Sequence, residues 1–141
     1  MTAQAPRDSD YQALAAFRAR LREFLAFSDG ASATVGMTQQ QYQALLALRA
    51  HQGTEPLSIR GLASLLLIKH HSAVGMVDRL EREGLVRREP SPRDRRVVAV
   101  RLTPRGVKAL AKLATVHRAE LRRIAPEFVR VMSILAAADP E

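Results

Sequence analysis

The 141-residue chain contains no cysteine. This absence excludes a disulfide scaffold, a thiolate zinc site, an iron–sulfur cluster, a cysteine nucleophile and a thiol redox switch. Aromatic side chains are few, since two tyrosines and four phenylalanines are the only ones. Packing of the hydrophobic core could use all of them, so an aromatic residue alone is weak evidence for a binding site.

Long apolar segments and catalytic motifs are missing as well. No run of about 18 uncharged apolar residues is present, so no transmembrane helix is predicted. The opening residues, MTAQAPRDSD, contain no apolar stretch of the kind that a secretory signal requires. A glycine-rich phosphate loop, a nucleophile elbow and a zinc-binding H-E-x-x-H pair are also absent. We therefore expect a soluble cytoplasmic protein that is not an enzyme and that holds no metal or other cofactor.

The chain does have a strong excess of positive charge. It contains 22 lysines and arginines against 14 acids, for a formal net charge of +8. Such a balance favours a polyanionic partner, namely DNA, RNA or an anionic membrane surface, with a solubilising surface charge as the alternative. Much of the excess lies within residues 79–105, where nine arginines stand against four acids. Arginine suits a nucleic-acid interface because its planar fork binds phosphates and base edges.

The first part of the chain predicts a tail, a helix and a loop. Residues 1–8 are expected to be a disordered tail. Apolar residues recur at helical spacing from residue 9 to residue 27, so a long first helix is expected there. Residues 28–37 are small and typical of turns, which predicts a loop.

Capping residues place the next helices. Thr38 and Gln41 have the spacing of a capping box, so a second helix is expected to begin there and to end near His51. Ser58 can cap a short third helix of about two turns. A fourth helix is expected over residues 70–83, after a short connection.

A β-hairpin is predicted after the fourth helix. Gly84 stands where a left-handed residue ends a helix. Residues 85–89 and 97–102 have the composition of β-strands. The polar, arginine-rich residues 90–96 are expected to form the loop between them.

A long fifth helix is expected to begin at Thr103 and Pro104, which suit the N-cap and the first helical position. Pro126 is expected to end or kink this helix, and residues 128–135 to form a last short helix. The third and fourth helices make a helix-turn-helix, and the hairpin makes a wing. The expected fold is therefore mostly α with a small β-hairpin, namely a winged helix-turn-helix flanked by long terminal helices.

The fourth helix is the predicted recognition helix. At about 100° per residue its apolar side chains form one stripe, which is expected to pack on the third helix. The N-terminal end of such a helix enters the major groove of DNA. The residues expected to face DNA are Lys69, His70, His71, Ser72, Gly75 and Arg79. The alternative is a polar face that contacts only solvent.

The hairpin loop carries the stronger signal for DNA binding. Arg93, Arg95 and Arg96 lie at a tip that has prolines and no apolar residue. An arginine there can enter a narrow minor groove, where the negative potential is enhanced. Asp94 cannot bind phosphate, so we expect it to orient a neighbouring arginine through a charge-assisted hydrogen bond. The alternative is a solvated charged turn.

Three motifs in this region resemble the MarR family of bacterial transcription regulators. They are L-E-R-E-G-L-V-R-R at residues 80–88, R-D-R-R at 93–96 and R-L-T-P-R-G at 101–106. The resemblance covers roughly residues 38–110. It implies a homodimer, joined by the first, fifth and last helices, that binds palindromic double-stranded DNA. It also implies control by a small ligand, often aromatic or phenolic, between the dimerisation and DNA-binding parts.

The resemblance also implies a division of the chain. Residues 1–8 are the tail, 9–37 the N-terminal dimerisation helix and loop, 38–103 the DNA-binding domain, and 104–141 the C-terminal dimerisation helices. The opening of the fourth helix, residues 69–75, departs from the Ser/Thr-rich, arginine-bearing opening frequent in the family. The preferred operator is therefore not implied.

The ligand pocket is expected between the first, second and fifth helices. Its candidate residues are Phe17, Tyr42, His51 and His117, with core packing as the alternative. The expected function is a repressor that binds its operator as a homodimer and is released by a small aromatic ligand. The alternative is a winged-helix adaptor that binds proteins and has no specific DNA site.

Overall fold

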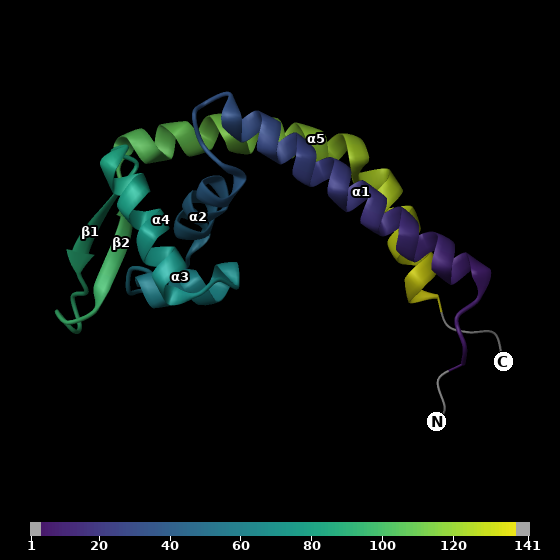
Figure 1. Cartoon of the computed structure of the whole chain (residues 1–141), viewed down its shortest axis with the longest axis horizontal. Coiled ribbons are helices and arrows are strands. Elements are labelled where there is room, and N and C mark those ends of the chain that lie inside the picture. The colour runs from purple at the N-terminus through teal and green to yellow at the C-terminus, as the bar shows by residue number, and fades with distance from the viewer. Residues whose placement is uncertain (1–3, 138–141) are drawn as a thin grey trace.

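The computed structural model describes residues 4–137, which form five helices and a two-stranded sheet (Figure 1). The helices are α1 (Asp8–Ala33), α2 (Gln39–Ala50), α3 (Ile59–Leu66), α4 (His70–Arg82) and α5 (Pro104–Ala136), and the strands are β1 (Val86–Pro90) and β2 (Val98–Leu102). Figure 1 shows α1 and the later part of α5 side by side as an arm that leads away from the other elements. The predicted fold class is confirmed. No helix within the described residues is long and apolar enough to cross a membrane.

The predicted caps hold the starts of three helices. The Gln41 N–H donates to the Thr38 hydroxyl at 3.1 Å, and the Thr38 N–H donates to the Gln41 side chain at 3.0 Å. Ser58 and Thr103 each accept one bond from the N–H three residues further on, at 3.0 Å. These bonds satisfy N–H groups that the helix itself leaves unpaired, so the three helices begin where the sequence predicts.

The hairpin follows α4 directly. Gly84 has a φ of 75°, the left-handed conformation predicted at this position. The two strands are antiparallel, in a register that runs from Val86 opposite Leu102 to Pro90 opposite Val98. Each strand lies within one residue of its predicted bounds, so the wing is confirmed as a structural element.

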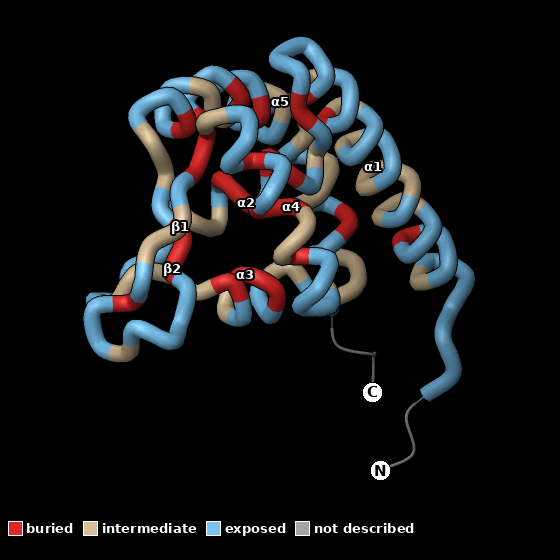
Figure 2. The backbone as a smooth tube through the Cα atoms, turned by 60° about the vertical axis from the view of Figure 1, so that its left-hand side comes forward, coloured by how far each residue is buried: buried red, intermediate tan, exposed pale blue. Residues whose placement is uncertain are grey.

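The core lies where α2, α3, α4 and α5 meet the hairpin, and Figure 2 shows it as the buried segments inside the molecule. Leu45, Leu62, Val77, Leu80 and Leu113 are among its fully buried side chains. Burial of each such side chain stabilises the fold by about 1.5–3 kcal/mol. The apolar stripe predicted on α4 is buried as expected, and the first turn of that helix is exposed.

The loop predicted for residues 28–37 is wrong over its first part, because α1 includes residues 28–33. Ser28 and Ser32 are buried, and Ser28 makes a hydrogen bond to α5. Packing of α1 against α5 outweighs the weak helix propensity of serine and glycine. The chain turns only at residues 34–36.

The break predicted at Pro126 is also wrong, because α5 is one continuous helix that includes residues 128–135. Proline removes one hydrogen bond of the helix, but the exposed ring of Pro126 does not enter the core. Packing against α1 holds the helix beyond this point, where the Phe17 and Phe128 rings lie edge to face with centroids 5.9 Å apart. The predicted last short helix is therefore the end of α5.

The predicted tail extends one residue too far, since α1 begins at Asp8. Residues 4–7 are exposed and have no regular structure. Residues 1–3 of that tail, and residues 138–141 of the predicted C-terminal dimerisation segment, lie outside the described residues. The dimerisation roles of α1 and α5 stay predictions.

Candidate nucleic-acid interface

Helix α4 presents its first turn to solvent. Lys69, His70, His71 and Ser72 are all exposed, as their predicted role requires. The Lys69 side chain, at the N-cap, makes no capping hydrogen bond. The first N–H groups of the helix thus gain no acceptor from that side chain, and the helix dipole is positive at this end. An anion such as a DNA phosphate would be favoured there.

The middle of α4 also has room on its outer side. Gly75 is half-buried, and a Cβ at this position would meet no atom within 4 Å. The fold itself therefore does not demand glycine at this position, which agrees with a role in close approach to a ligand. Arg79 is exposed and lines a cavity of about 430 Å³ together with Ser72.

In the wing, Asp94 holds Arg96. The Asp94 carboxylate accepts hydrogen bonds from Nε and Nη2 of Arg96 at 3.1 and 3.2 Å, and from the Arg96 backbone N–H at 3.1 Å. Bonds from the Arg96 side chain, and then from its backbone N–H, lower the pKa of Asp94. The predicted hydrogen bond between Asp94 and a neighbouring arginine is thus present, and the role of Asp94 in DNA binding stays a prediction. The Arg96 side chain is nevertheless 91% exposed, so it remains accessible to a phosphate.

The other two arginines of the wing differ from each other. Arg93 forms an ion pair with Glu55, in the loop between α2 and α3, with 3.3 Å between Nε and Oε1. This pair joins the wing tip to the rest of the DNA-binding unit and was not predicted. Arg95 is exposed at the tip. DNA binding by Arg93, Arg95 and Arg96 stays a prediction.

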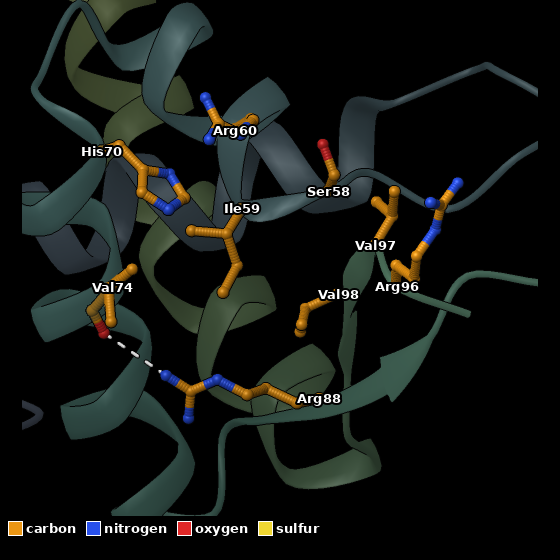
Figure 3. Close-up of a pocket in the computed structure, with 9 residues that line it drawn as sticks. All are labelled: Ser58, Ile59, Arg60, His70, Val74, Arg88, Arg96, Val97 and Val98. Atoms are coloured by element: carbon orange, nitrogen blue, oxygen red, sulfur yellow. Dashed lines mark hydrogen bonds between the residues drawn. The ribbon is translucent and has the colours of Figure 1, made fainter. Parts of the chain in front are cut away.

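A groove of about 410 Å³ separates α3, α4 and the wing (Figure 3). Its lining residues are Ser58, Ile59, Arg60, His70, Val74, Arg88, Arg96, Val97 and Val98. Three arginines and a histidine from four different elements therefore surround one space. The predicted recognition helix and the predicted wing meet here, on one face of the molecule.

Arg60 is an interface candidate that the sequence reasoning missed. It is exposed in the first turn of α3 and lies at the same groove as His70 and Arg96. The sequence alone places Arg60 in the first turn of the predicted third helix, because it follows the cap Ser58 by two residues. It was missed because only the fold shows that this turn faces the wing.

Two of the four predicted ligand residues lie together. The Tyr42 and His117 rings stack with centroids 4.1 Å apart, and Phe24 and Phe27 lie edge-on to His117. Burial raises the pKa of the Tyr42 hydroxyl.

The other two predicted ligand residues are elsewhere. Phe17 packs on Phe128 in the arm. The ring of His51 is hydrogen-bonded to the Glu55 carbonyl, with 2.9 Å between Nε2 and the oxygen. The structure therefore does not place these two residues beside the Tyr42–His117 pair.

His117 joins three helices. Its Nδ1 lies 2.7 Å from the Leu113 carbonyl oxygen and its Nε2 lies 2.8 Å from the Ser28 hydroxyl. Because a carbonyl oxygen only accepts, Nδ1 carries a proton, and in the neutral ring Nε2 accepts from Ser28. The stack on Tyr42 adds α2 to this contact between α1 and α5. A substitution at His117 would therefore alter the contact between α1, α2 and α5, where the arm meets the DNA-binding unit.

Comparisons with known proteins agree on one family. A sequence profile of the MarR family matches residues 35–97. The chain is 34% identical to a protein proposed as transcriptional regulator of the hcr operon of Thauera aromatica, over 68% of this chain and 56% of that protein. It is 33% identical to the HTH-type transcriptional regulator MhqR of Bacillus subtilis, over 64% of this chain and 58% of that protein. The chain thus spans just over half the length of these relatives.

The likeness of fold extends further than the matched sequence. The crystal structure of RV1404 from Mycobacterium tuberculosis is similar with a TM-score of 0.70 and 28% sequence identity. That match covers 100% of this chain and 99% of the other. The arm formed by α1 and α5 is therefore part of the shared architecture, and not only the winged unit.

Proposed function

We propose that this chain is a MarR-family transcription regulator that binds double-stranded DNA through α4 and the wing, because a profile of that family matches residues 35–97 and the relatives it resembles are named as transcriptional regulators. The observation that carries this proposal is the shared groove, at which His70 of α4, Arg60 of α3 and Arg96 of the wing meet. The two relatives described above are both named as transcriptional regulators.

The two parts of the interface have different proposed tasks. The first turn of α4 enters the major groove, where His71 and Ser72 contact base edges. Arg95 and Arg96 contact phosphates or enter the flanking minor groove. The exposure of all four side chains supports this division.

We propose that the protein acts as a homodimer on a palindromic site. Support comes from the arm, where Tyr11, Leu14, Val129 and Met132 are apolar and at least 48% exposed. Exposed apolar side chains on paired helices mark an interface. A second copy of the arm would bury them and place two α4 helices on half-sites about one DNA turn apart.

We propose that a small aromatic or phenolic ligand binds beside the Tyr42–His117 stack. A cavity of about 490 Å³ opens there, bordered by Tyr42, His117, Arg118 and Arg122. This volume suits a small ligand, Leu46, Ala114 and Leu121 supply apolar contacts, and the arginines suit an anionic oxygen. Calorimetric titration with benzoate and with phenol should give saturable heat, and Ala114→Trp should weaken the binding of both ligands by narrowing the cavity.

We propose repression as the sign of regulation, since a dimer bound over a promoter would exclude polymerase. A gel-shift assay with the DNA upstream of its own gene tests the function. The expected result is a sequence-selective shift that weakens steeply with salt. Absence of any shift at low salt would favour the rival function, a winged-helix adaptor that binds proteins.

A further inference from the structure

Arg88 differs from the other arginines of the hairpin. Its side chain is only 26% exposed, whereas that of the preceding Arg87 is 62% exposed. Neighbouring residues of a strand point to opposite faces, and the Arg88 side chain turns toward α4. Figure 3 shows it crossing from β1 to the carbonyl of Val74.

Arg88 binds three successive turns of α4. Its Nη1 donates to Oε1 of Glu81 at 2.9 Å, and its backbone N–H donates to Oε2 of the same carboxylate at 2.9 Å. Its Nη2 donates to Oδ1 of Asp78 and also approaches the Val74 carbonyl oxygen at 3.4 Å. The three acceptors are spaced at i, i+4 and i+7, so they lie along one stripe of the helix.

From this geometry we propose that Arg88 is a positioning residue that fixes α4 relative to the wing and does not itself bind DNA. The inference rests on the proposed function, since it concerns how the recognition helix is aimed. A planar fork that bonds two carboxylates is a rigid connector. It sets both the distance and the rotation between α4 and β1.

The electrostatics agree with this role. Burial lowers the pKa of Arg88, and the hydrogen bonds with Asp78 and Glu81 raise it by more, so that the net pKa is above its ordinary value. The charge of the guanidinium is balanced by two carboxylates in direct contact. A phosphate would have to compete with both of them, whereas Arg96 has a single acidic partner and is almost fully exposed.

The neighbouring ion pairs of the hairpin do not connect it to α4. Arg87 and Arg101 both pair with Glu89, within the hairpin itself. They therefore offer a matched comparison on the same strands. A substitution at Arg87 or Glu89 changes the surface of the wing, whereas a substitution at Arg88 changes the contact between the wing and the recognition helix.

The test uses two charge-balanced double variants, R88Q/E81Q and R87Q/E89Q. Each loses one positive and one negative charge, so the net charge is unchanged. The DNA probes are the duplex that the wild-type protein enriches from a randomised pool and a scrambled duplex of equal length. Affinity for both is measured by fluorescence anisotropy over a series of salt concentrations, and circular dichroism checks that each variant is folded.

The R88Q/E81Q protein should bind the enriched duplex at least tenfold more weakly, about the effect of one mismatched base pair. Its affinity for scrambled DNA should stay within about twofold and its salt slope should not change, because phosphate contacts set both. The R87Q/E89Q protein should keep its preference for the enriched duplex. The Arg88→Lys protein should also bind the enriched duplex more weakly than the wild type, because an ammonium cannot bond both carboxylates in the fork geometry.

Three results would overturn the proposal. Equal loss on both duplexes with an unchanged slope would show that Arg88 only supports folding. A slope reduced by about 0.9 would show that Arg88 contacts a phosphate. Unchanged affinity of R88Q/E81Q for both duplexes would show that the contact is unnecessary. A wild-type protein that enriches no duplex would refute the proposed function itself, which separates that failure from the other three.

Discussion

At Gly106 the backbone of α5 touches the start of the hairpin. A Cβ at this position would lie 2.0 Å from the Leu85 carbonyl oxygen, which is far inside van der Waals contact. The same oxygen accepts a hydrogen bond from the Thr103 N–H at 3.1 Å. The glycine of the R-L-T-P-R-G motif is therefore required because it allows α5 to dock where α4 ends. Gly30, in α1, has no such neighbour within 4 Å.

Alanine at these two glycines should have opposite effects on stability. Gly106→Ala should lower the free energy of unfolding by about 1–3 kcal/mol, because the methyl group forces the backbone apart. Gly30→Ala should raise it by about 0.5–1 kcal/mol, because alanine favours the helix and meets nothing. Urea denaturation of both variants measures the two values. A Gly106→Ala protein as stable as the wild type would show that the close contact is not a constraint.

The interface residues that could be predicted are those whose partners are near in sequence. Asp94 and Arg96 are two positions apart, so their pair follows from a short motif. Arg88 contacts Asp78 and Glu81 across the junction of helix and strand, and only the fold brings these groups together. Arg60 was missed for the same reason. Local spacing predicts local bonds, whereas groups brought together by tertiary packing need the structure.

In the wing, the hydrogen bonds with Asp94 hold the Arg96 side chain in one direction. Asp94→Ala should weaken binding to enriched and scrambled DNA by about two- to fivefold, the effect of an exposed ion pair. Asp94→Asn is the control, because it removes the charge and keeps an oxygen acceptor for Arg96. Anisotropy titrations at one fixed salt concentration measure both variants. Tighter binding by Asp94→Ala would mean that Asp94 merely repels DNA and that the wing is a solvated turn.

Helix starts could be predicted from the sequence, and two helix interiors could not. Thr38, Ser58 and Thr103 act through bonds to residues three positions on, so the sequence alone locates them. Residues 28–33 and Pro126 are weak helix formers by themselves. They are helical because α1 and α5 pack along their length, and such long-range packing is invisible to local propensity.

The molecule as a whole has an arm whose apolar surface its own chain leaves exposed. Leu14→Glu should therefore convert the proposed dimer to monomer, because a charge cannot be buried there without a partner. Gln12→Glu adds the same charge at another exposed position of α1, about 200° around the helix from Leu14, and should leave the dimer intact. Size-exclusion chromatography with light scattering at micromolar concentration measures the mass. A monomeric wild-type protein would contradict the dimer directly.

If two copies of α4 read one duplex, as proposed, selection from a randomised DNA pool will show it. The protein should enrich a palindromic sequence whose half-sites are centred about one helical turn apart, 10–10.5 base pairs. The complex with that duplex should contain two protomers, and scrambled DNA should bind at least about 10³-fold more weakly. Enrichment of no sequence, or of a single half-site bound by one protomer, would contradict the proposed dimer on a palindromic site.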